Sequence, residues 1–345
     1  DIKGQWTLNN IIHNRFDVHW YPSDEWKFNL GLRNRLIYGE SVQAFEQNTS
    51  LLNSANGLAP LGGIITQGKS YLLHSIIDRA YIDYKKDQTE ISLGRQRINW
   101  GLNLVWNPND IFNAYSYFDF DYEERPGTDA VRVQYYTGNT SSIEVAYKPG
   151  KTPDSTIASG LYRITIGSYD VQALAGIMDS DYAIGAGWSG VFIGGSGFSG
   201  EATAFVPRGN SGSHATVVSA STEFNYTFPS SLALRVAYLF NSGGSLRPNG
   251  MQFNPTISQV TAKMLSPARH SLFADAAYTF TPLITGDLAG IINPADGSFY
   301  VGPSCTFSLT NDISFLFGGE LFFGGSNTLY GEYGKLIFLR LKWSF

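Results

Sequence analysis

The last ten residues, Leu336-Ile-Phe-Leu-Arg-Leu-Lys-Trp-Ser-Phe345, decide the fold class. Alternate positions from Ile337 to Phe345 are apolar, and from Leu339 onward the positions between them are polar: Arg340, Lys342 and Ser344. Because successive side chains of a β-strand point to opposite faces, this period of two predicts a strand with one apolar and one polar face. A soluble β-sandwich can end in a strand, but a bulky aromatic in phase as its last residue favours a strand in a membrane.

The same alternation recurs upstream. Residues of one parity are apolar in four further runs: Ile313, Phe315, Phe317, Leu321 and Phe323; Leu272, Ala274, Ala276, Tyr278 and Phe280; Leu232, Leu234, Val236, Tyr238 and Phe240; Val218, Ala220, Phe224 and Tyr226. Each run ends in an aromatic residue near its turn, where an aromatic girdle meets the lipid interface. The chain is therefore predicted to be all-β, as a transmembrane antiparallel up-and-down barrel.

Composition agrees with a barrel. Only 43% of the 345 residues are hydrophobic and 15% are charged, whereas 14% are aromatic and 37 are glycine. No window of about twenty consecutive apolar residues exists, so a helical crossing is excluded and a closed barrel is the remaining way to span a bilayer. The net charge of -5 argues against a nucleic-acid partner. The single Cys305 allows no disulfide within the chain.

The connections between strands alternate in length. Short turns are expected near residues 85–88, 137–139, 228–231, 281–282 and 310–312, and long loops at 41–70, 101–127, 241–268 and 324–334. Short periplasmic turns with long outer loops are typical of outer-membrane barrels. The composition does not change along the chain, so residues 1–345 are predicted to form one transmembrane domain.

The number of strands read from the pattern is odd, unlike that of most bacterial barrels. The pattern gives about seventeen strands, the first from Gly4 to Trp20, whereas single-chain bacterial barrels normally have an even number. With the last strand running down to the periplasm, an odd count makes the first strand start outside the cell. We therefore expect a further strand before Asp1, giving about eighteen, with sixteen as the alternative. The numbered sequence begins at Asp1 without a positively charged, apolar export segment, so we expect an exported protein to be numbered from its mature start or later.

The polar face of the strands predicts the lining of the lumen. If Leu30, Leu32 and Leu36 face lipid, Arg33 and Arg35 face inward. The same argument gives a predicted lining of both charges: Arg33, Arg35, Arg79, Arg132, Arg163, Arg235, Glu144, Glu223, Asp275 and Glu320. A row of arginines in a pore attracts anions. Alternatively, each arginine pairs with a carboxylate on a neighbouring strand and only stiffens the wall.

The segment from Asn99 to Pro126 is too apolar for a loop in water, so it should pack against something. We expect it to fold into the barrel as a constriction, with these residues in it: Trp106, Asp110, Phe112, Tyr117, Asp119, Asp121, Glu123 and Glu124. The alternative is a loop packed over the rim or against a neighbouring subunit. The last four acidic residues could hold Ca²⁺, but they lack the glycine and spacing of a calcium loop, so no metal is predicted.

Two neighbouring segments carry a family resemblance. Gly94-Arg-Gln-Arg-Ile-Asn-Trp-Gly101 and Trp106-Asn-Pro-Asn-Asp-Ile-Phe112 resemble a region of porin-like Gram-negative outer-membrane barrels, including barrels of Bacteroidota. The terminal strand with Phe345 is similar to the last strand of bacterial outer-membrane proteins, which the barrel assembly machinery reads. The resemblance implies a fold and a membrane, and it names no substrate.

Three functional classes follow from these observations. The first is a channel for passive diffusion of small hydrophilic solutes that prefers anions. The second is a structural or assembly barrel within a larger complex, indicated by bulky residues of inward parity: Leu239, Phe273, Leu316 and Phe322. The third, an outer-membrane enzyme, is disfavoured because no recognisable nucleophile motif contains any of the five histidines: His13, His19, His74, His214 and His270.

We therefore predict a channel in the outer membrane, without a catalytic step or a cofactor. The expected partners are outer-membrane lipid and the barrel assembly machinery. A homo-oligomer or a complex with other envelope proteins remains open.

Overall fold

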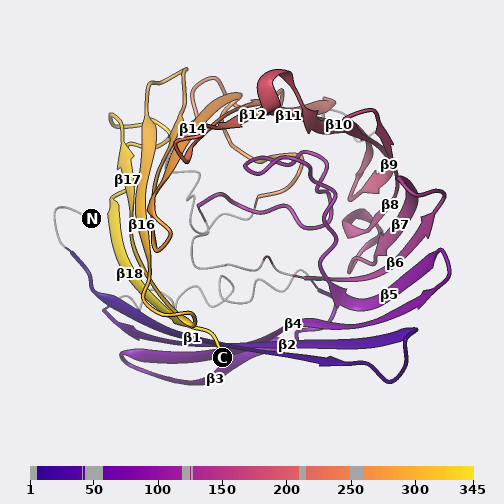
Figure 1. The fold of residues 1–345 in the computed structure, drawn as a ribbon, viewed down its shortest axis with the longest axis horizontal. Helices are drawn as coiled ribbons and strands as arrows, with labels where there is room; N and C mark the ends of the chain where they lie inside the picture. The colour runs from indigo at the N-terminus through magenta and orange to yellow at the C-terminus, as the bar shows by residue number, and fades with distance from the viewer. Residues whose placement is uncertain are drawn as a thin grey trace.

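The computed structural model describes residues 6–40, 42, 57–118, 125, 127–209, 215–248 and 260–345. Eighteen strands form one sheet that curls into a ring (Figure 1). In chain order they are β1 (Asn9–Trp20), β2 (Trp26–Gly39), β3 (Gly62–Gly68), β4 (Tyr71–Lys86), β5 (Thr89–Gln96), β6 (Thr128–Tyr136), β7 (Ser141–Lys148), β8 (Ile157–Ile166), β9 (Tyr169–Met178), β10 (Asp181–Val191), β11 (Gly197–Pro207), β12 (Val217–Thr227), β13 (Leu232–Asn241), β14 (His270–Thr281), β15 (Ile284–Ile292), β16 (Phe299–Ser308), β17 (Ile313–Phe323) and β18 (Lys335–Trp343). Two 3₁₀ turns, Pro153–Ser155 and Ile193–Gly195, lie in connections.

Neighbouring strands pair antiparallel in chain order from β4 to β18, and β1 pairs with β2. The order changes only at β3. Strand β2 pairs with β4 along almost its whole length, and β3 pairs with residues 71–76 of β4 while β5 pairs with residues 80–86. Strand β3 is therefore a short strand that pairs with the first part of β4, on the same edge to which β5 pairs further along.

The predicted all-β, antiparallel up-and-down barrel of about sixteen to eighteen strands is confirmed, with eighteen strands in the structure, but the expected positions of two strands were wrong. The first strand begins at Asn9 and not at Gly4, and β3 lies in the 41–70 segment that was expected to be a loop. Its sequence, Gly-Gly-Ile-Ile-Thr-Gln-Gly, has adjacent apolar residues and terminal glycines, so it has no period of two to detect.

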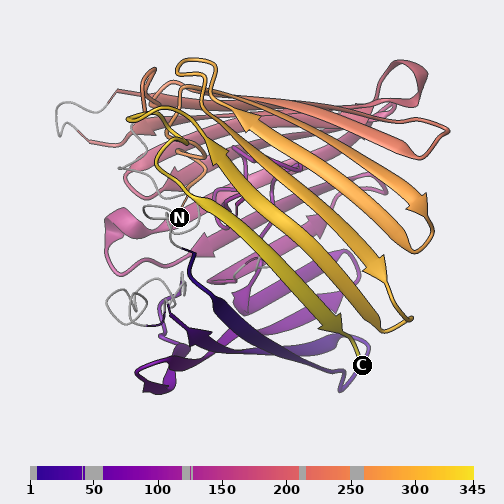
Figure 2. The ribbon, with the colours of Figure 1, turned by 90° about the vertical axis from the view of Figure 1, so that its left-hand side faces the viewer.

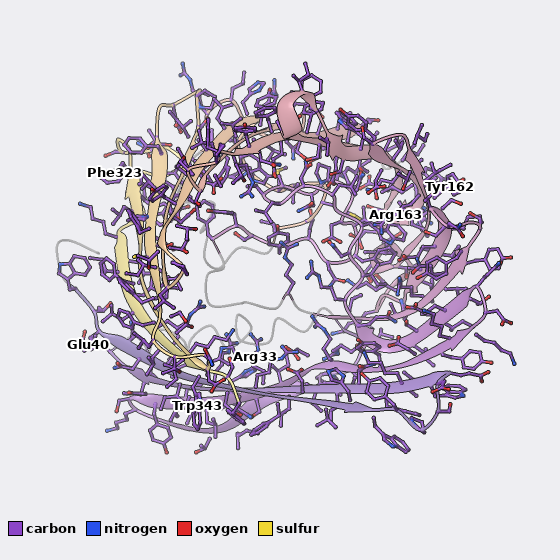
Figure 3. All side chains as sticks on the ribbon, in the orientation of Figure 1. Arg33, Glu40, Tyr162, Arg163, Phe323 and Trp343 are labelled. Carbon is purple, nitrogen blue, oxygen red and sulfur yellow. The ribbon has the colours of Figure 1, made fainter. Side chains whose placement is uncertain are left out.

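The wall is apolar outside and polar inside, as the alternation predicts. Leu339 and Leu341 of β18 are 67% and 69% exposed on the outer face, whereas inward-facing polar side chains such as Glu201, Thr203 and Glu223 are buried. Figure 3 shows Tyr162, Phe323 and Trp343 on the outside of the ring, with Arg33 and Arg163 pointing inward. An apolar outer surface of this kind is stable only against lipid. Among the described residues, no helix is long and apolar enough to cross a membrane.

The connections also follow the predicted alternation. Short turns lie at one rim and longer loops at the other (Figure 2). Two-residue turns at the long-loop rim are exceptions: one joins β3 to β4, and the other joins β9 to β10. In the second turn Asp179 adopts a left-handed conformation with φ of 55°.

The connection between β5 and β6 does not stay at the rim. Its described part, residues 97–118, runs inside the ring of strands (Figure 1). The buried core of the protein therefore lies between this infolded loop and the inner face of the barrel.

Candidate functional site

Glu201 of β11 holds the infolded loop to the wall. Its side chain is 1% exposed and accepts backbone hydrogen bonds from Leu102, from Asn103 at 2.7 Å and from Asn109 at 3.0 Å. A carboxylate that accepts several backbone N–H groups satisfies donors that an irregular buried loop cannot satisfy by itself. Glu201 therefore anchors the loop.

Asn109 makes a second attachment, both to β11 and to its neighbour β10. The hydroxyl of Thr203 donates to Asn109 Oδ1 at 2.7 Å, and Asn109 Nδ2 donates to the carbonyl of Ala186 at 3.1 Å. The inward positions of β10 opposite this side chain are glycines. A Cβ at Gly185 would lie 2.8 Å from Asn109 Oδ1, and a Cβ at Gly187 would lie 2.9 Å from Asn109 Nδ2. Bare backbone at these positions makes room for the loop.

Trp100 is fully buried at the first bend of the loop. Its indole Nε1 donates to Glu144 Oε1 at 2.6 Å, and its carbonyl accepts from Gln172 Nε2 at 2.6 Å. The Trp100 and Phe112 rings meet edge to face with centroids 4.9 Å apart. Further along, the backbone N–H of Leu104 donates to Glu223 at 3.0 Å.

A second aromatic cluster holds the other side of the loop. Phe118 meets Tyr300 edge to face at 5.0 Å and lies 5.7 Å from Phe322, while Tyr117 meets Phe273 at 5.1 Å. Buried Trp106 belongs to the same cluster, as does Leu239. Three of the four inward bulky residues that suggested a filled barrel, Leu239, Phe273 and Phe322, therefore belong to the cluster that packs around the infolded loop.

Asp110 is completely buried in the loop and accepts a long hydrogen bond of 3.5 Å from the backbone N–H of Trp100. Burial raises the pKa of this carboxyl group to about 6, against the opposing charges of Arg97 and Arg125. Trp106, Asp110, Phe112 and Tyr117 belong to the segment 97–118, which lies inside the ring of strands. The other four acidic residues of the predicted constriction, Asp119, Asp121, Glu123 and Glu124, lie outside the described residues. Within the described ranges, no group of three potential metal ligands is found.

Strands β1 to β6 form a sector of the wall rich in charged side chains. Arg33 and Arg35 share the lumen face of β2, and Arg35 stands opposite His74 of β4. On β1, Arg15 pairs with Asp17 and with buried Asp78, each at 2.7 Å. Arg95 of β5 pairs with Asp129 of β6 at 2.7 Å. Basic groups of this sector are therefore partly balanced by aspartates.

The remaining predicted arginines differ in the partners of their guanidinium groups. Arg132 lies between Glu90 at 3.2 Å and Glu144 at 3.0 Å, and Arg235 lies between Glu223 at 3.1 Å and Asp275 at 3.4 Å. Both match the alternative of ion pairs that stiffen the wall. Predicted Glu320 is buried on β17. The hydrogen bonds of Arg79 reach the backbone carbonyls of Asp78 and Arg125 at 2.8 and 2.5 Å.

Arg163 of β8 has neutral hydrogen-bond partners. Its Nε donates to Gln172 Oε1 at 3.0 Å, and its Nη2 donates to the carbonyl of Asn99 at 3.2 Å. These bonds fix the guanidinium group beside a cavity of about 320 Å³. The cavity is lined by strand and loop residues: Asn99, Gly101, Leu102, Thr140, Arg163, Ile164, Thr165 and Asp170.

The sequence pattern did not indicate Glu201, Asn109 and Gln172 as site residues. Glu201 is the only acidic residue of β11 and has the inward parity of Ser199 and Thr203, so its position was detectable. Its partners were not detectable, because Glu201 and Asn103 are 98 residues apart in the chain.

The histidines make local contacts. His19 Nδ1 lies 2.7 Å from Asn29 Oδ1, and His270 Nδ1 lies 2.7 Å from the hydroxyl of Tyr238. His214 lies outside the described residues.

No protein-family model matches the sequence, and no characterised protein matches it by sequence. Solved structures do match the fold. OccK5 (OpdH) of Pseudomonas aeruginosa has a TM-score of 0.58 at 10% identity, over 96% of this chain and 94% of that chain. OccK8 (OprE) of the same species gives 0.57 at 11% identity, over 93% and 94%. OccAB1 of Acinetobacter baumannii gives 0.53 at 11% identity, over 97% and 89%.

The chain therefore has the fold of the Occ/OprD outer-membrane porins of Gram-negative bacteria. It is an outer-membrane β-barrel with an infolded loop between β5 and β6.

Proposed function

We propose that this protein is a passive channel through which small hydrophilic solutes diffuse across the outer membrane. The observation that carries the proposal is the attachment of the loop to one part of the wall through Glu201, Asn109 and Trp100. A barrel of this many strands is too wide for its own side chains to fill. A loop fixed along its inner face narrows such a barrel and sets the size of the solute.

We further propose that the channel prefers anions. Arg163 supports this preference, because a guanidinium group held by the neutral oxygens of Gln172 and Asn99 keeps its positive field. Arg33 and Arg35 add two positive charges on one strand beside His74. Arg132 and Arg235 contribute less, because each is balanced by two carboxylates.

The test is single-channel conductance of the purified protein in a planar bilayer, with the reversal potential measured under a KCl gradient. We expect stable conductance steps and a reversal potential on the chloride side. Arg163→Gln and the double variant Arg33→Gln/Arg35→Gln should move the reversal potential toward the potassium side. Lys86→Gln is the matched control, since it removes one positive charge beside Glu25 at the short-turn rim. A cation preference of the unaltered protein would refute the anion proposal but leave the channel, and silence would refute the channel.

The partners remain proposals of the same kind. The last residue, Phe345, is 88% exposed beyond β18, so its ring is accessible to the barrel assembly machinery. We expect Phe345→Ala to lower the amount of folded barrel in the outer membrane, measured as the heat-modifiable band on an unboiled gel. The origin in Bacteroidota rests on the likeness of the two segments at 94–101 and 106–112.

A further inference from the structure

A largely apolar groove of about 640 Å³ lies on the outer side of the wall, across strands β11 to β16. Small residues of β14 and β15, Ala274 and Gly290, form its base, and larger residues such as Phe224 and Phe299 form its sides. Phe299 is 39% exposed, whereas the next residue, Tyr300, is buried on the lumen side. The groove therefore opens outward, toward the bilayer.

The base of the groove is deep because two small residues are neighbours in the sheet. Ala274 is opposite Val236 on one side and opposite Gly290 on the other. Gly290 is in turn opposite Val301. A Cβ at Gly290 would have near it only the carbonyl oxygens of Tyr300, at 3.4 Å, and of Ala274, at 4.0 Å, so the space above it is open. An empty groove forfeits van der Waals contacts that an occupant of matching shape restores.

The row of registered residues that contains Gly290 leads to the rim of the long loops. It continues through Val301 and Leu321 to Lys335, the first residue of β18, which starts at that rim (Figure 2). In the other direction the row reaches Phe198, the second residue of β11, which starts at the short-turn rim. The groove therefore follows an oblique line across the wall, and Lys335 stands where that line meets the rim.

Polar and charged groups lie at this rim end of the groove. Lys335 is exposed, and its Nζ lies 5.5 Å from the centroid of the Phe323 ring. Phe323 stacks on Phe299 of the groove, with ring centroids 4.9 Å apart. Near the same rim the hydroxyl of Tyr238, which also lines the groove, lies 2.7 Å from His270 Nδ1. An apolar groove that ends at a cation matches the polarity of an anionic lipid.

We propose that this groove is a binding site for one anionic lipid, whose acyl chain lies along Ala274 and Gly290 and whose phosphate headgroup lies at Lys335. The groove faces the hydrocarbon of the outer membrane, and a flexible chain can follow its oblique course. Basic residues at a membrane surface attract anionic headgroups. A second copy of the chain matches less well, because a twofold interface places the same concave surface on both subunits and leaves the groove empty. The inference rests on the membrane location and is independent of channel activity.

The first test is native mass spectrometry of the folded barrel in detergent, titrated with phosphatidylglycerol or with phosphatidylcholine of the same acyl chains. We expect one phosphatidylglycerol molecule to bind saturably, and phosphatidylcholine to bind several-fold more weakly. Lys335→Gln should remove this difference between the two lipids. Lys86→Gln, which removes a positive charge beside Glu25 at the short-turn rim, is the control and should keep the difference. Equal binding of the two lipids by the unaltered protein would overturn the role of Lys335.

The second test fills the groove without adding a polar group. Gly290→Leu should weaken binding of both lipids about tenfold or more, because several CH₂ groups of the chain lose their place in the groove. The matched control is Gly160→Leu on β8, which has the outward parity of Tyr162 and open space above it, since a Cβ there would lie 3.8 Å from the carbonyl of Glu144. The control should bind lipid like the unaltered protein. The same affinity in both variants would overturn the proposal.

The third test needs no variant. The unaltered protein is reconstituted with phosphatidylglycerol that carries a diazirine in its acyl chain, and the labelled peptides are mapped after irradiation. We expect the label to concentrate on β13 to β16 over β6 to β8, which lie across the ring (Figure 1). Even labelling around the wall would overturn the proposal. A barrel that retains the lipid but conducts no current would refute the channel and support the lipid site, so the two failures are distinguishable.

Discussion

The part of the wall that carries the loop and the part formed by β1 to β6 both place acidic side chains in the lumen, but they use them differently. Beneath the loop, Glu201 accepts backbone N–H groups of a segment that has no strand partners. On β1 and β5, Arg15 and Arg95 pair with aspartates of the wall itself. A carboxylate in the first part attaches a loop, and a carboxylate in the second part balances a neighbouring arginine. The type of residue alone therefore does not define its role.

The largest effect is expected when the loop loses its main anchor. Glu201→Ala leaves three buried backbone donors without an acceptor, at a cost of about 1–3 kcal/mol each. The loop should detach, so that conductance rises several-fold and hydrogen exchange accelerates at Leu102, Asn103 and Asn109. Glu90→Ala is the matched control, since Glu90 pairs with Arg132 on the wall. Equal hydrogen-exchange rates of these loop amides in Glu201→Ala and Glu90→Ala would show that the loop does not depend on Glu201 more than on a carboxylate of the wall.

The next effect concerns pH and Asp110. Its pKa in the folded protein, about 6, lies above the ordinary value of 3.8, so folding favours the protonated carboxyl group. Stability from this group is complete below pH 4 or so and is lost as the pH rises toward about 6, for a total of about 3 kcal/mol. The urea midpoint of the unaltered barrel should therefore be higher at pH 4.5 than at pH 7.5. In Asp110→Asn this difference between the two midpoints should be smaller. The same pH dependence in both proteins would show that other groups cause it.

A smaller effect should follow from filling the space that glycine leaves on β10. In Gly187→Val the new side chain meets Asn109 and Leu102, and overpacking of this kind costs about 1–3 kcal/mol. We expect a shift in the conductance level with the barrel still folded on an unboiled gel. The control is Gly160→Ala on β8, because a Cβ at this position would meet only ordinary van der Waals contacts. An unchanged conductance in Gly187→Val would mean that the loop does not depend on this space.

The smallest effect is expected when an ion pair of the wall is removed as a unit. Arg132→Gln/Glu90→Gln removes one positive and one negative charge that lie 3.2 Å apart, so the field in the lumen changes little. The reversal potential should stay within experimental error of the unaltered protein, whereas Arg163→Gln should move it. A shift as large as that of Arg163→Gln would place Arg132 among the residues that set selectivity.

Much of this arrangement could be predicted from the sequence, for a physical reason that differs between strands and loop. Strands of a membrane barrel must alternate apolar and polar residues, so the parity of Leu339 and Leu341 is visible in the sequence. The infolding of the segment around Trp106 and Phe112 could be predicted because apolar residues in a long loop need a surface to cover. Strand β3 could not be predicted, because its seven residues include two adjacent isoleucines and so show no alternation of apolar and polar positions.

The sequence by itself determined the barrel, its apolar outer face, the alternating turns and the loop that folds inward, because each is a local pattern imposed by lipid or by water. Only the tertiary structure decided which acidic groups anchor the loop and which balance arginines. Folding of the loop against the inner wall brings Asn103 to Glu201, and the pairing of β5 with β6 brings Arg132 to Glu90.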